Sequence, residues 1–161
     1  MLARIFVLAA AALALAACSS SNPEGSVAPV GGPGAGASRF GPGSQQDLAQ
    51  TAGDRVFFEY DKSDISGEGQ QILERQARWL QRYPNVSVTI EGHTDERGTR
   101  EYNLALGERR AQTVKNALVA LGIQSGRIQT ISYGKERPIV VGSDEQGYAQ
   151  NRVGITTVNG G

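Results

Sequence analysis

Apolar residues follow three different distributions along the 161-residue chain. Residues 5–17 are apolar without interruption, and Arg4 is the only charge before them. Apolar residues become sparse over 18–46, and from 47 onward they recur at the regular spacings of helices and strands. The pattern therefore predicts three parts, at 1–17, 18–46 and 47–161, of which the last folds as a domain.

Periodicity predicts a strand, a helix and a second strand in the first half of that domain. The run Arg-Val-Phe-Phe-Glu-Tyr at 55–60 is β-branched and aromatic, which is typical of a strand. Ser66 can cap a helix, in which apolar residues recur at helical spacing as far as the break at Pro84. Trp79 in this helix is interpreted as a packing or partner-facing aromatic. Apolar and polar residues then alternate over 86–90, as in a half-buried strand.

A long helix and two further strands are predicted downstream. A polar loop at 93–100 precedes a helix at 101–121, which Gly122 closes. A strand, a loop and a closing strand follow at 128–133, 137–147 and 152–158. The order β-α-β-α-β-β predicts an α+β fold of two layers, in which two main helices pack on a mixed four-stranded sheet.

The apolar run at the start predicts a secretory signal peptide at 1–17. Its thirteen residues reach about 20 Å as a helix, whereas the bilayer core is about 30 Å thick. The residues Leu15-Ala16-Ala17-Cys18 resemble the bacterial lipobox, which implies that Cys18 is the acylated first residue of the mature protein. Two or more acyl chains anchor a protein stably. By resemblance to enterobacterial sorting, Ser19 implies the outer membrane.

Residues 19–46 predict a flexible tether. They hold 7 of the chain's 21 glycines and 4 of its 6 prolines, and such a segment buries too little apolar surface to offset its ordering entropy. Its coil span is about 29 Å and its full extension roughly 90 Å. A domain anchored through Cys18 could therefore reach a layer tens of ångströms from the membrane.

Charge and composition exclude several classes of function. The 16 basic and 16 acidic residues balance, which gives no electrostatic reason to expect nucleic acid. One Cys and one His exclude a disulfide framework and a Cys/His zinc cluster, and neither a metal nor a cofactor is expected. His93 is interpreted as a structural or site-lining residue. The sequence contains no nucleophile elbow and no phosphate loop, so catalysis is not expected.

The long helix contains one conflict in its pattern. Leu106, Val114 and Leu118 lie on one stripe at four-residue steps, and Arg110 occupies the missing position of that stripe. The neighbouring Arg109 falls on a polar face. We therefore expect Arg109 to be solvated and Arg110 to need an anionic partner, because an unpaired buried charge is costly.

Asp95 is the nearest candidate partner, since it lies just past the second strand, in the loop that leads into this helix. Two interpretations are open on the residues alone. Asp95 and Arg110 could form a salt bridge that pins the loop. Alternatively, Asp95 could bind an ammonium and Arg110 a carboxylate, so that together they grip a zwitterionic amino-acid end.

The domain resembles the OmpA-like peptidoglycan-binding domain family over about residues 53–158. The most specific match combines Gly92-His93-Thr94-Asp95 with Asn103-x-x-Leu106-x-x-x-Arg110-Ala111. The other matching segments are 56–65, 132–138 and Asn151-Arg152. The lipobox and tether match the lipoprotein members of the family, whereas the porin type has a membrane barrel before this domain. The family's closing motif usually has a second Arg, where this chain has Val153.

The resemblance implies that Asp95 and Arg110 bind the diaminopimelate of a peptidoglycan stem peptide. The further site residues that it implies are Asn103, Leu106, Thr94, Tyr60, Asp61 and Arg152. It also implies a periplasmic domain that links the outer membrane to the cell wall, with TolB and the Tol complex as partners in envelope integrity and cell division. A lipid-anchored protein-interaction module with little peptidoglycan binding is the alternative, and a secreted hydrolase is a weaker one.

Overall fold

The computed structural model describes residues 41–160. The predicted signal peptide at 1–17, the lipidation site Cys18 and most of the predicted tether lie outside these residues. None of the helices in the described part is long and apolar enough to cross a membrane.

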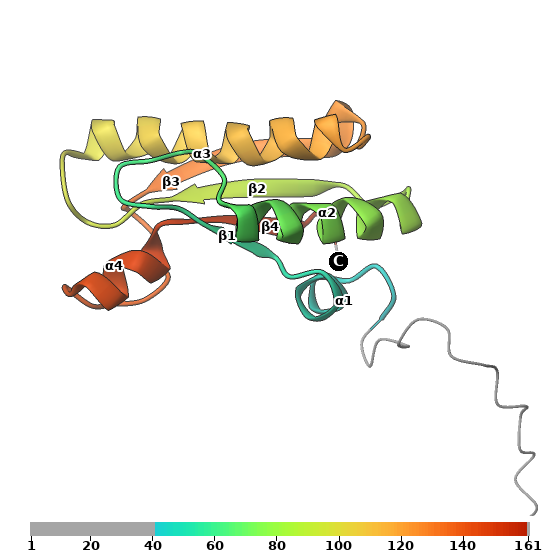
Figure 1. The fold of residues 1–161 in the computed structure, drawn as a ribbon, viewed down its shortest axis with the longest axis horizontal. Coiled ribbons are helices and arrows are strands. Elements are labelled where there is room, and N and C mark those ends of the chain that lie inside the picture. Colours follow the sequence, from blue (N-terminus) through green and yellow to red (C-terminus); the bar gives the residue numbers. More distant parts are fainter. Residues whose placement is uncertain (1–40, 161) are drawn as a thin grey trace, which may run out of the picture. The chain divides into compact units, whose positions relative to one another are not determined.

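A four-stranded mixed sheet forms one layer of the domain (Figure 1). Its order is β1 (Arg55–Phe57), β4 (Val153–Val158), β2 (Val88–His93) and β3 (Ile128–Gly134). The last strand, β4, is antiparallel to both of its neighbours, whereas β2 and β3 are parallel. The predicted mixed sheet is confirmed. Strand β1 ends three residues earlier than predicted, and β2 spans Val88–His93 where the periodicity predicted 86–90.

Two long helices, α2 (Gly67–Arg82) and α3 (Arg100–Ala120), pack against this sheet. Ser66 caps α2, because its hydroxyl accepts a hydrogen bond from the Gly69 amide. Thr99 caps α3 in the same way. Gly122 has a φ of +93° and follows the end of α3, so the predicted stop is confirmed. The two-layer α+β fold with two main helices is therefore present.

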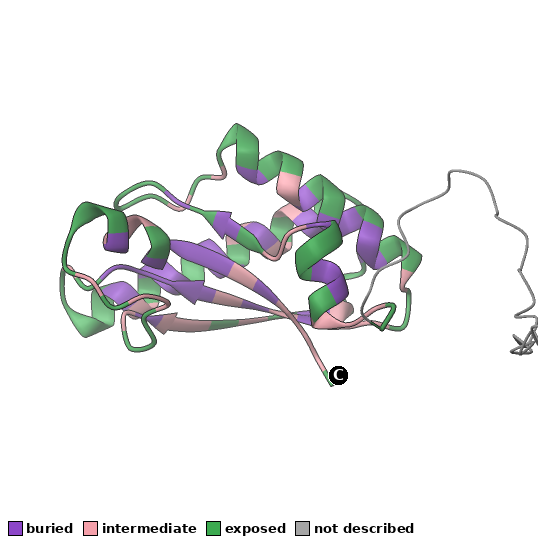
Figure 2. Ribbon diagram, turned by 90° about the horizontal axis from the view of Figure 1, so that it is seen from below, coloured by how far each residue is buried: buried purple, intermediate pink, exposed green. Residues whose placement is uncertain are grey.

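The core lies between these helices and the sheet (Figure 2). The predicted stripes of both helices face inward and meet the inward residues of the strands. Fully buried members of this core are Val56, Leu73, Leu80, Val88, Ile90, Val114 and Leu118. Each such side chain contributes about 1.5–3 kcal/mol on burial. Arg110 occupies the same stripe and is also fully buried.

Two short helices were not predicted from the sequence. Helix α1 (Gln45–Thr51) is capped by Ser44 and buries one large apolar residue, Leu48. Helix α4 (Glu145–Asn151) is capped by Asp144 and occupies the end of the region predicted as loop. Neither helix is long enough to display an apolar period, and both depend on tertiary contacts.

Trp79 joins α1 to the rest of the domain. Its indole Nε1 donates a hydrogen bond to Asp47 Oδ2 at 3.0 Å, and its ring centroid lies 4.8 Å from that of Tyr83. The side chain is almost completely buried. Trp79 therefore serves packing, one of the two roles expected for it.

Glycines allow α3 to approach the sheet closely. A Cβ on Gly92 would lie 1.9 Å from the Gly107 carbonyl oxygen, and a Cβ on Gly107 would lie 2.3 Å from Ser132 Oγ. Only glycine, which has no Cβ, fits at these two positions. The first half of α3 is therefore held against the carboxyl ends of β2 and β3, and its inward side chains reach the loop that follows β2.

Candidate functional site

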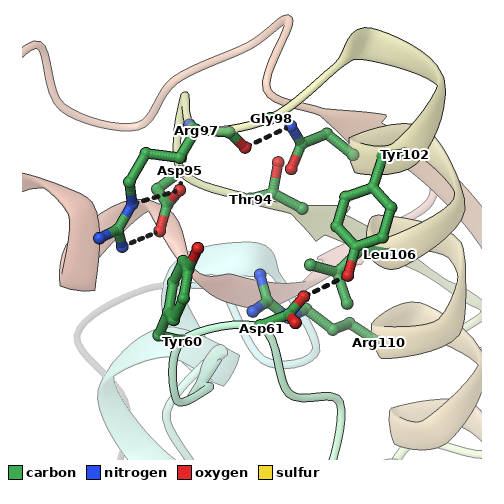
Figure 3. A pocket seen from close by; sticks show the side chains of 10 residues that line it. Tyr60, Asp61, Thr94, Asp95, Arg97, Gly98, Tyr102, Leu106 and Arg110 are labelled. Carbon is green, nitrogen blue, oxygen red and sulfur yellow. Dashed lines mark hydrogen bonds and ion pairs between the residues drawn. The ribbon is translucent and has the colours of Figure 1, made fainter.

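A pocket of about 210 Å³ lies where the loop after β2, the turn after β1 and the first half of α3 meet (Figure 3). Its lining residues are Tyr60, Asp61, Thr94, Asp95, Arg97, Gly98, Tyr102, Asn103, Leu106 and Arg110. Seven of the eight predicted binding residues are among them, and Arg152 is not. The structure thus brings together residues that are up to fifty positions apart along the chain.

Arg110 forms the floor of this pocket and also fixes its wall. Its Nε donates to the Lys62 carbonyl at 2.8 Å, and one terminal nitrogen donates to the Glu59 carbonyl at 3.1 Å. The other terminal nitrogen donates to the His93 carbonyl at 2.8 Å. The turn that carries Tyr60 and Asp61 is therefore clamped between two of these bonds.

Arg110 and Asp95 form no direct ion pair within 4.0 Å among the described residues. The salt-bridge interpretation of this pair is therefore wrong, although the nearby charges of Asp95 and Asp61 act to raise the pKa of Arg110. Three carbonyl oxygens accept hydrogen bonds from the guanidinium, two of them in the turn after β1 and one at the end of β2. Burial lowers the pKa of Arg110 to about 10, so the group stays charged at neutral pH.

Asp95 is instead bonded to two other arginines. Arg97 donates to it from Nε at 3.1 Å, from a terminal nitrogen at 2.6 Å and from its backbone amide at 3.2 Å. Arg152 lies 3.4 Å from Asp95 Oδ2. Burial acts to raise the pKa of Asp95, but the hydrogen bonds from Arg97 and Arg152 outweigh it, and the pKa lies below its ordinary value.

Arg152 supports Asp95 from behind the pocket. Its Nε donates to the Phe58 carbonyl at 3.1 Å, and a terminal nitrogen lies 2.8 Å from a Glu145 carboxylate oxygen. Arg152 lines a different, more open groove of about 500 Å³. The next residue, Val153, stands where the family usually has a second arginine and is fully buried in β4.

Thr94 and Asn103 give the pocket its polar interior. The Thr94 hydroxyl is buried and has no hydrogen-bond partner among the described residues. The Asn103 amide donates to the carbonyls of Arg97 and Thr99 at 2.8 and 3.0 Å, which fixes the loop after β2. A buried hydroxyl without a partner costs about 1–3 kcal/mol, so it favours a ligand that supplies one.

The rim of the pocket is aromatic and partly exposed. Tyr60 is 56% exposed, and the Arg97 guanidinium lies over its ring at 4.1 Å. Asp61 has a φ of +57°, a conformation that Asp tolerates better than most residues. The Tyr102 hydroxyl donates to Asp61 across the mouth (Figure 3).

His93 supports the site through its backbone. The ring is 2% exposed, with Nδ1 at 3.0 Å from the Arg137 carbonyl and Nε2 at 3.6 Å from Glu91. Burial holds its pKa below the ordinary value. Because its carbonyl accepts from Arg110, His93 acts as a structural residue behind the pocket. No cluster of metal ligands occurs among residues 41–160.

Three lining residues, Arg97, Gly98 and Tyr102, were not predicted. Tyr102 lies one turn before Leu106 and two turns before Arg110, so the four-residue stripe could have identified it. Arg97 and Gly98 belong to an irregular loop, whose backbone path carries no periodic signal. Gly98 has a φ of +92°.

Comparison with known proteins assigns this fold and pocket to a family. The sequence profile of the OmpA family matches residues 57–152. The chain belongs to the OmpA family. Relatives named peptidoglycan-associated lipoprotein match almost its whole length. The one from Agrobacterium fabrum is 50% identical over 150 residues, covering 92% of this chain and 84% of the relative. The one from Brucella melitensis is 51% identical over 148 residues, covering 92% and 87%.

Solved structures agree with this assignment. The crystal structure of the peptidoglycan-associated lipoprotein from Burkholderia pseudomallei matches with a TM-score of 0.64 and 40% identity, covering 66% of this chain and 90% of that one. The C-terminal domain of Helicobacter pylori MotB matches with a TM-score of 0.63 and 23% identity, covering 67% and 85%. The second likeness concerns the fold alone.

Proposed function

We propose that this protein is an outer-membrane lipoprotein that binds peptidoglycan stem peptides non-covalently and ties the membrane to the cell wall. The observation that carries the proposal is the convergence of buried Asp95, buried Arg110 and the unpartnered Thr94 hydroxyl on one pocket. Its relatives are named peptidoglycan-associated lipoproteins, which supports the same function.

The pocket suits the zwitterionic end of diaminopimelate. Arg110 uses three of its five N–H groups on carbonyls, so two are left for a ligand carboxylate. Asp95 supplies the negative charge for an ammonium. Thr94 supplies a hydroxyl, and Leu106 an apolar wall against the methylene chain between the two ionic ends. Because these groups recognise charge at fixed positions, we propose binding rather than catalysis.

The remaining parts of the proposal concern attachment and partners. Residues 1–17 would be the signal peptide, Cys18 the lipidated residue, and the predicted tether at 18–46 would lead into the domain, with its last two residues in α1. The domain would face the periplasm. We further propose that TolB and the Tol complex are partners, and that the protein serves envelope integrity and cell division.

Co-sedimentation with purified sacculi tests the binding proposal. The protein purified in detergent should pellet with sacculi, whereas Asp95→Ala and Arg110→Ala should remain in the supernatant. Glu96→Ala and Arg109→Ala are matched controls, since each removes the same charge from the adjacent, exposed position. Both controls should pellet like the wild type.

Two outcomes would contradict the proposal. If Asp95→Ala and Arg110→Ala pellet like the wild type, the pocket does not hold peptidoglycan. If the folded wild type itself stays in the supernatant, the alternative of a protein-interaction module is favoured. Release of soluble muropeptides would indicate a hydrolase, and none is expected.

A further inference from the structure

The Asp95 carboxylate, which is proposed to receive the ligand ammonium, already accepts hydrogen bonds from two arginines of the protein itself. Asp95 Oδ1 accepts from the backbone amide and the Nε of Arg97, and Oδ2 accepts from a terminal nitrogen of Arg97 and from Arg152. A carboxylate offers about four acceptor positions. A ligand cation can therefore reach Asp95 only if one of these donors leaves.

The Arg97 side chain is the donor that can leave most easily. Its side chain is 35% exposed, whereas that of Arg152 is 7% exposed and is tied to the Phe58 carbonyl. If Arg152 moved away, the buried Phe58 carbonyl would lose this hydrogen-bond donor, which is costly. If the Arg97 guanidinium moves away from Asp95, the Arg97 backbone amide still donates its hydrogen bond to Asp95, so the loop keeps one of its contacts.

The Arg97 guanidinium also contacts a second anion, Glu145. Glu145 Oε2 is 3.4 Å from one of its terminal nitrogens, and this carboxylate is 66% exposed. The rings of Tyr60 and Tyr148 lie 4.1 and 4.4 Å from the central carbon of the Arg97 guanidinium. Cation–π contacts with these rings can persist when the guanidinium moves. The guanidinium can thus release Asp95 and keep both an anion and aromatic faces.

We propose that Arg97 is an internal competitor for the ligand, a cation that binds Asp95 until the ammonium of a ligand replaces it. The proposal rests on the proposed function. Exchange of one cation for another keeps the buried carboxylate neutralised at every stage. A ligand without the ammonium cannot make this exchange, since it would leave Asp95 with too few donors. Arg97 therefore competes with the ammonium of a zwitterionic ligand and does not compete with a neutral ligand.

The test compares two soluble peptides by isothermal titration with the full chain in detergent. One is the tripeptide L-Ala-γ-D-Glu-meso-diaminopimelate, and the other is the same peptide acetylated on the free diaminopimelate amine. Arg97→Gln should bind the free-amine peptide about two- to fivefold tighter than the wild type, the range expected when a partly exposed competing ion pair is lost. Its affinity for the acetylated peptide should not change.

Arg100→Gln is the matched control, because it removes the same charge from a nearby exposed position that pairs with Glu136. It should leave both affinities unchanged. In the wild type, the Arg97 Nε–H resonance should shift with the free-amine peptide and not with the acetylated one. That spectrum tests the exchange without any substitution.

Several results would overturn the exchange. Weaker binding of both peptides by Arg97→Gln would make Arg97 a direct ligand contact. Equal tightening of both peptides, or the same gain in Arg100→Gln, would make the effect one of net charge. An unmoved Arg97 resonance on saturation would also contradict it. Failure of both wild type and Arg97→Gln to bind either peptide would overturn the proposed function, and the exchange with it.

Discussion

Arg110 combines two tasks at the residue scale. Its guanidinium is fully buried, holds the turn after β1 through two carbonyls and reaches the pocket from below. The sequence predicted its inward position from the stripe with Leu106 and Val114. It did not predict carbonyl partners, because the direction of backbone carbonyls in a turn leaves no pattern in the side chains.

Arg110→Lys tests whether the domain needs the geometry of the Arg110 guanidinium in addition to its positive charge. A lysine keeps the positive charge but cannot bond three carbonyls in fixed directions, so the turn after β1 should lose its clamp. We expect a loss of about 1–3 kcal/mol in the free energy of unfolding, measured by urea denaturation. Arg109→Lys, on the exposed neighbour, should change it by less than about 0.5 kcal/mol. Equal stability of both variants would contradict the clamp.

His93 should make stability fall with pH below neutrality. Its folded pKa is lowered by burial, so the unfolded chain binds a proton at higher pH than the folded one. The contribution is complete above the unfolded value of about 6.5 and is lost as pH falls from there toward the folded pKa. Glu91 and Arg137 are the charged groups beside the ring, and they oppose one another.

His93 is the chain's one histidine, so urea denaturation at pH 7.5 and 5.5 isolates its effect. The wild type should be less stable at pH 5.5, and His93→Gln should show a smaller difference between the two values. The lowered pKa of Asp95 contributes only at lower pH, since its stabilisation is lost as pH falls through the acid range below about 4. A difference unchanged by His93→Gln would contradict the assignment.

At the scale of elements, the site depends on how closely α3 approaches the sheet. The helix starts at the Thr99 cap and touches β2 and β3 through glycines, which places its inward residues over the strand ends. Caps and periodicity predicted both long helices and the four strands. The short helices α1 and α4 and the insertion of β4 between β1 and β2 come from tertiary contacts, which no local pattern encodes.

Gly107→Ala tests the close approach. The added Cβ would lie 2.3 Å from Ser132 Oγ and 2.8 Å from the Gly92 carbonyl oxygen, so the helix must shift. We expect a loss of about 1–3 kcal/mol in the free energy of unfolding, although alanine is the better helix former. Gly126→Ala, where nothing lies within 4 Å of the new atom, is the control. An equally or more stable Gly107→Ala variant would contradict the packing argument.

At the scale of the whole molecule, the sequence predicted most of the pocket residues and the membrane attachment, whereas the structure revealed how Asp95 is bonded. The residues proposed to bind were predicted from an OmpA-like motif, and the pocket contains all of them except Arg152. The role of Arg97 as hydrogen-bond donor to Asp95 was not predicted, because its position depends on aromatic rings from the turn after β1 and from α4 that only the folded chain brings together. Membrane attachment was predicted from residues outside the described part.

Cys18→Ser tests that attachment. Without the thiol no diacylglycerol can be added, so the variant should lose incorporation of radiolabelled palmitate and leave the membrane fraction. Binding to sacculi in detergent should be unchanged, since the pocket lies in the folded domain. Palmitate incorporation and membrane retention equal to those of the wild type would contradict the lipobox prediction.

The central claim is that the pocket between Asp95 and Arg110 holds the stem peptide. The most direct measurement is an NMR titration of the ¹⁵N-labelled protein with the tripeptide L-Ala-γ-D-Glu-meso-diaminopimelate. Saturable shifts should concentrate on Tyr60, on the loop from Thr94 to Gly98 and on the Arg110 side chain. Absence of saturable shifts, or shifts confined to the open groove beside Phe57, would contradict the account.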